Sequence, residues 1–366
     1  MVLNPVLAMK KYLIPSPVNY CIRTALTCAV FFMSMSLYLF PAALNLPGGF
    51  DQREVAQGII EIHQGKFQLA EKRFGAIRDK YPERPEGYML LSLYYSIYMN
   101  YYKTFKYRDK FYSAAEEAVD LSRQFIQSAP AEEIPFYRFY LGGTIGYLGI
   151  QKLREGSILS SFKDGLEGVR IFRKVLEENT NIIDAYFGLS QFHYYKYYYK
   201  NKLSFIPLGK NDKELAYTYM NLVIREGYFL SVEALLSLFS IRIYENELDN
   251  IEQDIITKYR QYPGNIFFCY KLLDLYEKTG ESEKSLQVLD DVLAHLNRNP
   301  DSGPAAYILV LYQGAKAAYS GGFTAKALRF LEIQQTYRSS IEGCFDDKEN
   351  IEKGSELLKK IRKEIN

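Results

Sequence analysis

The sequence predicts an all-α protein in which about seven helix pairs stack into an α-solenoid behind an N-terminal hydrophobic segment. Small and large apolar residues recur at fixed offsets with helical spacing, which is typical of stacked helix pairs. The composition, 48% hydrophobic and 24% charged over 366 residues, is that of a folded chain. This length suits about two compact domains or one elongated array, and the recurring offsets favour the array.

The first helix pair is predicted after residue 50. A small residue lies in its first helix, a glycine follows at the turn, and the second helix carries a small residue, a large apolar residue and a closing proline: Gly58, Gly65, Ala70, Phe74 and Pro82. A small residue on each helix allows the two backbones to approach, and the large ring fills the space between pairs. We therefore expect two closely packed helices here.

The same offsets return later in the chain. Near the C-terminus they are occupied by Ala315, Gly322, Ala327 and Leu331, and before that by Leu272, Tyr276, Gly280, Ser285 and Leu289. The first-helix pattern is Tyr88-x2-Leu91-Ser92-x2-Tyr95 and again Tyr186-x2-Leu189-Ser190-x2-His193. These motifs resemble the tetratricopeptide repeat (TPR) signature, with Tyr in the place of Trp. The resemblance implies a right-handed superhelix that acts as an interaction protein.

The middle repeats are longer than the TPR period of about 34 residues. Comparable starts fall near Pro85, Ile134, Ile183 and Ser231, 48 or 49 residues apart. We expect the extra residues to lengthen the connection between the two helices of a pair, from Tyr95 to Ala118 and from His193 to Ala216. Residues 179–195 and 226–247 also resemble a subgroup that includes long-repeat bacterial proteins and the eukaryotic inclusion-body-clearance family.

Two further segments flank the solenoid, which we place at residues 51–344. An amphipathic helix over 349–365, within a C-terminal segment 345–366, is expected to cap the array with a polar face. Residues 1–50 carry Lys10, Lys11 and Arg23 before an uncharged stretch over 24–50. Such asymmetry is typical of an export signal. It predicts an inner-membrane anchor with the body facing the periplasm, or a periplasmic protein if the leader is cleaved. The alternative is a buried first helix of a cytosolic fold.

Charge and motif content exclude several functions. Three of the 45 basic residues lie in the leader, so 42 bases face 43 acids in the body, which argues against nucleic-acid binding. The three histidines and four cysteines lack metal-ligand spacing, although a Cys269–Cys344 disulfide stays open in an exported protein. The glycine cluster at 141–146 lacks the strand-turn-helix context of a dinucleotide site. We expect neither a cofactor nor an enzyme.

Two stretches, residues 101–112 and 193–202, combine aromatic rings with a net charge of +3 each. If both occupy lengthened connections, a regular solenoid places them on one edge. Such surfaces are typical of protein interfaces and of membrane interfaces. The alternative is that tyrosines fill wide gaps between repeats while lysine stems cover them, and that His193 is a packed core ring. The candidate partner-binding residues are Tyr88, Tyr95, Tyr101, Tyr102, Lys103, Lys106, Tyr107, Arg108, Tyr186, His193, Tyr194, Tyr195, Lys196 and Lys200.

The sequence therefore predicts a non-catalytic scaffold that binds a protein or peptide partner in the cell envelope. The alternative function is a membrane-surface or lipid-associated protein that docks through the basic-aromatic edge. In either case the N-terminal segment, if retained, is a membrane contact.

Overall fold

The computed structural model describes residues 51–202, 212–341 and 345–365, with the side chains of 199–202 left aside. The leader and its predicted export role lie outside these residues. The elements are α2 (Gln52–His63), α3 (Phe67–Lys80), α4 (Pro85–Tyr102), α5 (Arg108–Ser128), α6 (Ile134–Arg154), α7 (Ile158–Glu178), α8 (Ala185–Lys202), α9 (Asp212–Glu226), α10 (Ser231–Tyr244), α11 (Ile251–Gln261), α12 (Ile266–Thr279), α13 (Ser282–Arg298), α14 (Pro304–Ser320), α15 (Thr324–Thr336), the 3-10 turn η2 (Tyr337–Ser340) and α16 (Asp347–Ile365).

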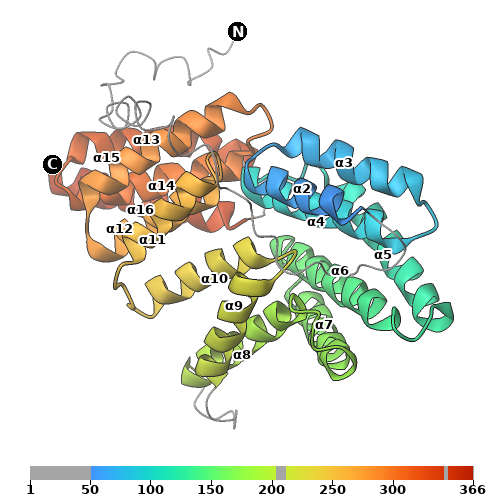
Figure 1. Ribbon diagram of the computed structural model, residues 1–366. Helices are drawn as coiled ribbons and strands as arrows, with labels where there is room; N and C mark the ends of the chain where they lie inside the picture. The colour runs from blue at the N-terminus through green and yellow to red at the C-terminus, as the bar shows by residue number, and fades with distance from the viewer. Residues whose placement is uncertain (1–50, 203–211, 342–344, 366) are drawn as a thin grey trace, which may run out of the picture.

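Over the described residues the chain is helical without strands, and its helices form seven consecutive pairs, α2–α3 to α14–α15, followed by α16 (Figure 1). Each helix packs against its neighbours in sequence. The first helices of the pairs also contact one another, α4 against α6, α6 against α8, α10 against α12 and α12 against α14. They form an inner layer. The all-α prediction is confirmed, and the sequential packing is consistent with an α-solenoid.

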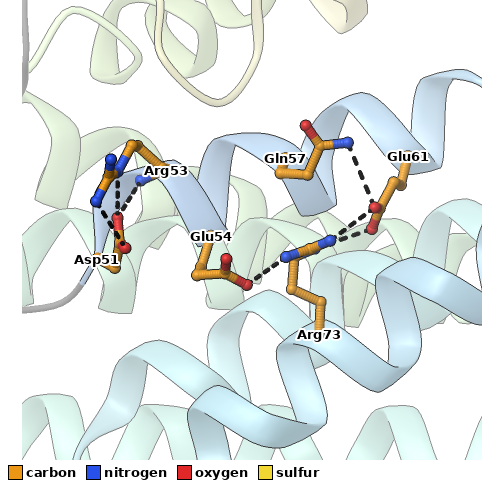
Figure 2. Close-up of polar contacts among 6 residues, drawn as sticks. All are labelled: Asp51, Arg53, Glu54, Gln57, Glu61 and Arg73. Carbon is orange, nitrogen blue, oxygen red and sulfur yellow. Dashed lines mark hydrogen bonds and ion pairs between the residues drawn. The ribbon is translucent and has the colours of Figure 1, made fainter.

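Close packing inside the first pair follows the predicted small-to-large pattern. A Cβ added to Gly58 on α2 would lie 2.2 Å from Cε1 of Phe74 on α3, a distance that only a glycine permits. Polar contacts on the outer side join the same two helices (Figure 2). The Arg73 guanidinium donates to both Glu54 and Glu61, at 2.9 Å from Nη2 to Glu61 Oε1. Gly58 and Arg73 thus fix α3 against α2 from two sides.

The start of α2 is capped locally. The Asp51 side chain accepts a hydrogen bond of 3.0 Å from the Arg53 backbone N–H, in addition to a contact with the Arg53 guanidinium (Figure 2). A carboxylate in this position satisfies one of the free N–H groups of the first turn. The described fold therefore begins with a conventional N-cap.

The long middle repeats differ from the prediction. Helices α4 and α5 have 18 and 21 residues, against 12 and 14 for α2 and α3. The connection between α4 and α5 is only the five-residue segment 103–107. The extra residues therefore lengthen the helices, and the prediction of a lengthened connection over 95–118 is wrong. The stretch 193–202 also lies inside helix α8. In α4 the tyrosines are buried, and this burial keeps the helix intact despite the modest helix propensity of Tyr.

The array returns on itself. The backbone N–H of Gly303, before α14, donates a hydrogen bond of 2.8 Å to the carbonyl of Tyr102 at the end of α4. The Tyr228 hydroxyl, before α10, donates to the carbonyl of Gln52. In Figure 1 the start of the described chain (blue) accordingly lies beside the orange helices near its end. These contacts between residues far apart in sequence curl the array, so that the inner layer surrounds one space.

One buried carboxylate fixes the turn before α10. Asp184, 1% exposed, accepts hydrogen bonds from three consecutive backbone N–H groups, those of Tyr228, Phe229 and Leu230, at 2.8–2.9 Å. Burial raises the pKa of Asp184 to about 6, while the three N–H donors act in the opposite direction. The α9–α10 connection is therefore held against the start of α8.

Candidate functional site

A central cavity of about 540 Å³ lies between the first helices of the seven pairs. Every one of these helices contributes to its wall, as do a few residues beside them. Among the lining residues are Ile62 and His63 on α2, Ser96, Ile97, Asn100 and Tyr101 on α4, Tyr147, Ile150 and Arg154 on α6, Gly188 on α8, Glu233, Leu236, Ser237 and Ser240 on α10, Phe267, Lys271 and Asp274 on α12, Gln313 on α14, and Lys103. No outer helix except α7 supplies a lining residue among those described. The cavity is thus the inner surface of the array.

The wall of the cavity is mostly apolar. Ile97, Tyr147, Leu236 and Phe267 face it from four different helices, and each is half-buried. Ligand sites of this size, within roughly 300–1,000 Å³, combine apolar walls with a few convergent polar groups. The polar groups here therefore decide what the cavity can bind.

Two cations lie in this wall with no carboxylate partner among the residues that the structure describes. Lys103 ends α4 in the left-handed conformation, φ 48°, and its Nζ donates to Asn100 Oδ1 at 2.8 Å. Arg154, at the end of α6, donates from Nη1 to the carbonyl and hydroxyl oxygens of Ser96 at 3.1 and 3.2 Å. Across the described residues, no carboxylate oxygen lies within ion-pair distance of either cation, whereas the neighbouring Lys106, Lys152 and Lys271 each have one.

The Phe345 ring covers both cations. Its centroid lies 5.4 Å from Lys103 Nζ and 5.7 Å from the Arg154 guanidinium carbon. An aromatic face attracts a cation without neutralising its charge. Lys103 and Arg154 therefore lie near the same ring, which leaves their charge uncompensated.

The surroundings weaken protonation of Lys103. Burial is the largest cause, followed by repulsion from Arg154 and Lys271, and together they lower the pKa of Lys103 to about 7. Asp346 and Asp274 act in the opposite direction but do not restore the ordinary value. Burial likewise lowers the pKa of Arg154 to about 10. A counter-charge arriving in the cavity would relieve both groups.

An acidic group lies on the α10 side of the same cavity. Burial raises the pKa of Glu233 to about 8, and burial lowers the pKa of His63 to about 4. Both shifts favour the neutral forms, and the two groups lie in contact, 3.5 Å from His63 Nε2 to Glu233 Oε2. The Glu233 Oε2 atom has no hydrogen-bond partner among the described protein atoms. It can donate or accept a hydrogen bond toward the cavity.

The sequence-predicted residues of the first stretch lie mostly inside the fold. Tyr95, Tyr101 and Tyr102 are buried in the main core, where their rings pack around Phe67 and Tyr107. Tyr101 also lines the cavity. Their rings fill the gap between repeats, as expected from the alternative in which the tyrosines of this stretch are packing residues.

The remaining residues of the first group differ in environment. Tyr88 is half-buried against the core. Lys106 and Arg108 are exposed, and each has an acidic partner, Asp301 at 2.7 Å for Lys106 and Glu155 at 2.8 Å for Arg108. Lys103 alone of these basic residues reaches the cavity.

The second stretch forms a separate cluster on α8. Tyr194 is buried with Ala216 and Met220, and its hydroxyl donates to Glu245 at 3.1 Å. Tyr195 is 53% exposed. Tyr186 is half-buried and packs against Tyr219. Among the described residues no ring contact joins this cluster to the rings of the first stretch.

The polar members of that cluster face one carboxylate. His193 Nδ1 and Lys196 Nζ lie 2.7 and 2.9 Å from the two oxygens of Asp212. His193 is therefore a packed and hydrogen-bonded ring rather than an exposed one. The Lys200 side chain lies outside the described part of the structure.

Sequence reasoning missed most of the cavity. Arg154, Glu233 and Lys271 belong to no motif, and only their position on an inner helix could have pointed to them.

The other sequence candidates have structural places. The glycine cluster at 141–146 lies within α6, in contact with α7: a Cβ on Gly142 would meet Ile171 at 3.0 Å. Cys269 is buried with a free thiol, and Cys344 lies outside the described residues. The structure, so far as it is described, holds no cluster of three metal-ligating side chains.

Exposed apolar side chains gather where α6 meets α7. Ile150 and Leu153 on α6 and Ile158, Leu159, Phe162 and Leu166 on α7 are all exposed, Leu159 at 87%. Elsewhere in the described residues large apolar side chains are exposed only singly or in pairs. We call these six residues the α6–α7 patch. None of the described helices is long and apolar enough to cross a membrane.

Searched against known protein families and against curated proteins, the sequence matches neither a family model nor a curated relative.

Proposed function

We propose that the protein is a non-catalytic scaffold of the TPR-like type that binds a protein or peptide partner through its central cavity. One observation carries this proposal: a helix from each of the seven pairs lines a single, mostly apolar cavity. In a TPR-like array these first helices form the concave binding face. Rigid repeats need little ordering on binding, which favours affinity.

The finer family assignment rests on sequence and packing together. Helices α4, α6 and α10 begin at Pro85, Ile134 and Ser231, the starts expected from the repeat spacing. The contact of Gly58 with Phe74 is the small-to-large packing that the TPR signature implies. Both features support a right-handed TPR-like superhelix of long repeats.

The proposed compartment is the cell envelope. It rests on the leader, in which Lys10, Lys11 and Arg23 precede an uncharged stretch. The body would face the periplasm from an inner-membrane anchor, or be periplasmic after cleavage. The near balance of bases and acids in the body supports a protein partner rather than a nucleic acid.

Site-specific photocrosslinking tests the binding proposal. A photoreactive amino acid placed at Leu236 faces the cavity, whereas one at Leu69 on α3 is exposed on the outside. Crosslinking in cells is expected to give a discrete partner adduct from position 236 and not from position 69. Ser237→Trp, which fills the cavity, should abolish the adduct. Ser113→Trp, on the exposed side of α5, should leave it unchanged.

A partner adduct that survives Ser237→Trp would place the partner elsewhere. Equal adducts from positions 69 and 236 would also overturn the cavity as the binding site. In both cases the circular dichroism of Ser237→Trp must match that of the wild type, so that a lost adduct reports on the cavity and not on unfolding.

A second function, docking on a membrane surface, is favoured by the α6–α7 patch. Contiguous exposed apolar side chains on a soluble surface mark a contact with a partner or a membrane. The basic-aromatic stretches support this function less well, because their rings are largely buried and Lys106 and Arg108 are paired. The patch offers Leu159 and Phe162 for insertion instead.

Liposome flotation separates the second function from the first. Protein lacking residues 1–46 should float with anionic vesicles if the patch inserts, and Leu159→Asp with Phe162→Asp should return it to the soluble fraction. Flotation that is unchanged in this double variant would rule out the patch. A pure protein scaffold stays in the soluble fraction throughout.

A further inference from the structure

The charge balance of the cavity leaves two cations free for a ligand. Lys271 is neutralised by Asp274, at 2.6 Å from Nζ to Oδ2. Burial favours the neutral form of Glu233 by raising its pKa to about 8, and its carboxyl contacts His63 and neither of the two cations. Asp346 influences Lys103 only from beyond ion-pair distance. Lys103 and Arg154 therefore face a cavity in which the other charged groups are paired or neutral.

Such an arrangement costs stability unless something compensates it. A half-buried cation beside a second cation is unfavourable, and proteins usually supply a carboxylate or replace the pair with apolar residues. Within the described part of the chain, Arg154 donates only to Ser96 oxygens, and Lys103 donates only to Asn100. Both groups retain further N–H donors that can donate hydrogen bonds to an anionic ligand.

The apolar wall defines the rest of the ligand. From the cation pair the lining continues over Ile97, Tyr147, Leu236 and Phe267, which offer few hydrogen-bonding groups. A small hydrophilic anion would leave this surface in contact with water. A ligand that carries one anionic end on an apolar chain satisfies both parts of the cavity.

We propose that the cavity binds a terminal carboxylate carried on an apolar chain, with the carboxylate held by Lys103 and Arg154 and the chain lying against the apolar wall. The planar guanidinium of Arg154 matches the two oxygens of a carboxylate, and Lys103 adds a point charge. This ligand class deepens the function proposed above and rests on the cavity being the binding site. A free long-chain fatty acid and the C-terminus of an apolar peptide both supply this chemistry.

Photoaffinity labelling of the full-length chain in nanodiscs distinguishes the relevant groups. One probe is dodecanoic acid with a diazirine in its chain, and its matched control is the corresponding dodecanol. The peptide arm uses an apolar pentapeptide with a photoreactive residue, with either a free or an amidated C-terminus. Mass spectrometry then measures labelling of the cavity-lining segments of α4, α6 and α10. If the fatty acid labels more strongly, the carboxylate comes from a lipid. If the free-ended peptide labels more strongly, it comes from a peptide C-terminus.

We expect a carboxylate probe to label these segments about 10- to 100-fold more than its uncharged control, because charge-assisted hydrogen bonds are lost in the control. Lys103→Met and Arg154→Met should each bring labelling down toward the level of the control. Lys72→Met, on the exposed side of α3, should have no effect. The ratio of labelling by dodecanoic acid to labelling by dodecanol is measured on the wild type. It therefore tests the need for a carboxylate even if Arg154→Met fails to fold.

Equal labelling by charged and uncharged probes would overturn the role of the cation pair while leaving the cavity as a binding site. If no carboxylate probe labels the cavity above background, the ligand class is wrong. The crosslink from position 236 would then still decide, independently, whether a partner occupies the cavity.

Discussion

The Tyr101 hydroxyl accepts a hydrogen bond of 2.9 Å from the backbone N–H of Ile266, 165 residues further along the chain. The same hydroxyl donates to the carbonyl of Gly264. Ile266 is the first residue of α12, so its N–H has no partner within its own helix. A side chain at the end of α4 therefore caps α12. This contact is one of those that curl the row of helix pairs around its central cavity.

Removing that hydroxyl should loosen the closure. Tyr101→Phe leaves the Ile266 N–H and the Gly264 carbonyl without their partner, and an unsatisfied buried group costs about 1–3 kcal/mol. We expect the free energy of unfolding, measured in urea, to fall by about that amount. Tyr88→Phe, at a half-buried tyrosine, should change it by less than about 0.5 kcal/mol. An equal loss in both variants would show that the Tyr101 hydroxyl has no special role.

Closure also depends on a close approach at Gly303. A Cβ added to this glycine would lie 2.0 Å from the Lys103 carbonyl oxygen, so Gly303→Ala forces the end of α4 away from α14. We expect normal helicity by circular dichroism but loss of the crosslink from position 236. Gly75→Ala, where an added Cβ meets nothing within 4 Å, is the matched control. If Gly303→Ala retains the full crosslink, binding does not require closure.

The buried Asp184 provides a test of the inner layer. Asp184→Ala removes the acceptor of three backbone N–H groups, and we expect a loss of about 2–4 kcal/mol in the free energy of unfolding. Asp184→Asn keeps one carbonyl oxygen that can accept, so it should cost less than Asp184→Ala. Chemical denaturation measures both. An Asn variant as unstable as the Ala variant would mean that the N–H acceptor is not what the turn requires.

Carboxylate binding should weaken as pH rises. Lys103, with a pKa lowered to about 7, is charged below that pH and loses its charge above it. Glu233, with a pKa raised to about 8, becomes negative above that pH. Arg154, with its pKa lowered to about 10, stays charged over most of the range from pH 6 to pH 9, and Lys271, Asp274 and Asp346 are the other charged groups that act on Lys103. Both titrations weaken binding of an anion as pH rises. Dodecanoate labelling should therefore fall by about tenfold from pH 6 to pH 9.

The uncharged dodecanol probe supplies the control for this pH series, since its labelling should stay constant. Lys103→Met should remove the part of the dependence centred near pH 7 and leave the part above pH 8. A dodecanoate profile that is flat across the range would contradict the assignment of Lys103 to the carboxylate.

Much of the helix layout could be predicted from local pattern. Pro85, Ile134 and Ser231 begin their helices as the repeat spacing suggested, since the spacing repeats the apolar faces of neighbouring pairs. The predicted start at Ile183 falls two residues before Ala185, where α8 begins.

The cavity could not be predicted in the same way. Periodicity reports which residues face the adjacent helix, and it carries no information on contacts between α4 and α12. Lys103 was a candidate because of its aromatic neighbours, whereas its actual distinction is the lack of a carboxylate partner. Arg154 lies in no motif, and only the fold brings it to the same cavity and the same Phe345 ring as Lys103.

Native-state hydrogen exchange tests closure of the inner surface most directly. The Ile266 and Gly303 N–H groups bond only to Tyr101 and Tyr102 across the closure, and an open solenoid would leave both to water. We predict that both amides exchange far more slowly than unprotected amides, and that Tyr101→Phe accelerates exchange at Ile266. Exchange of both amides at unprotected rates, with the helices intact, would show that the solenoid is open and that the cavity does not form.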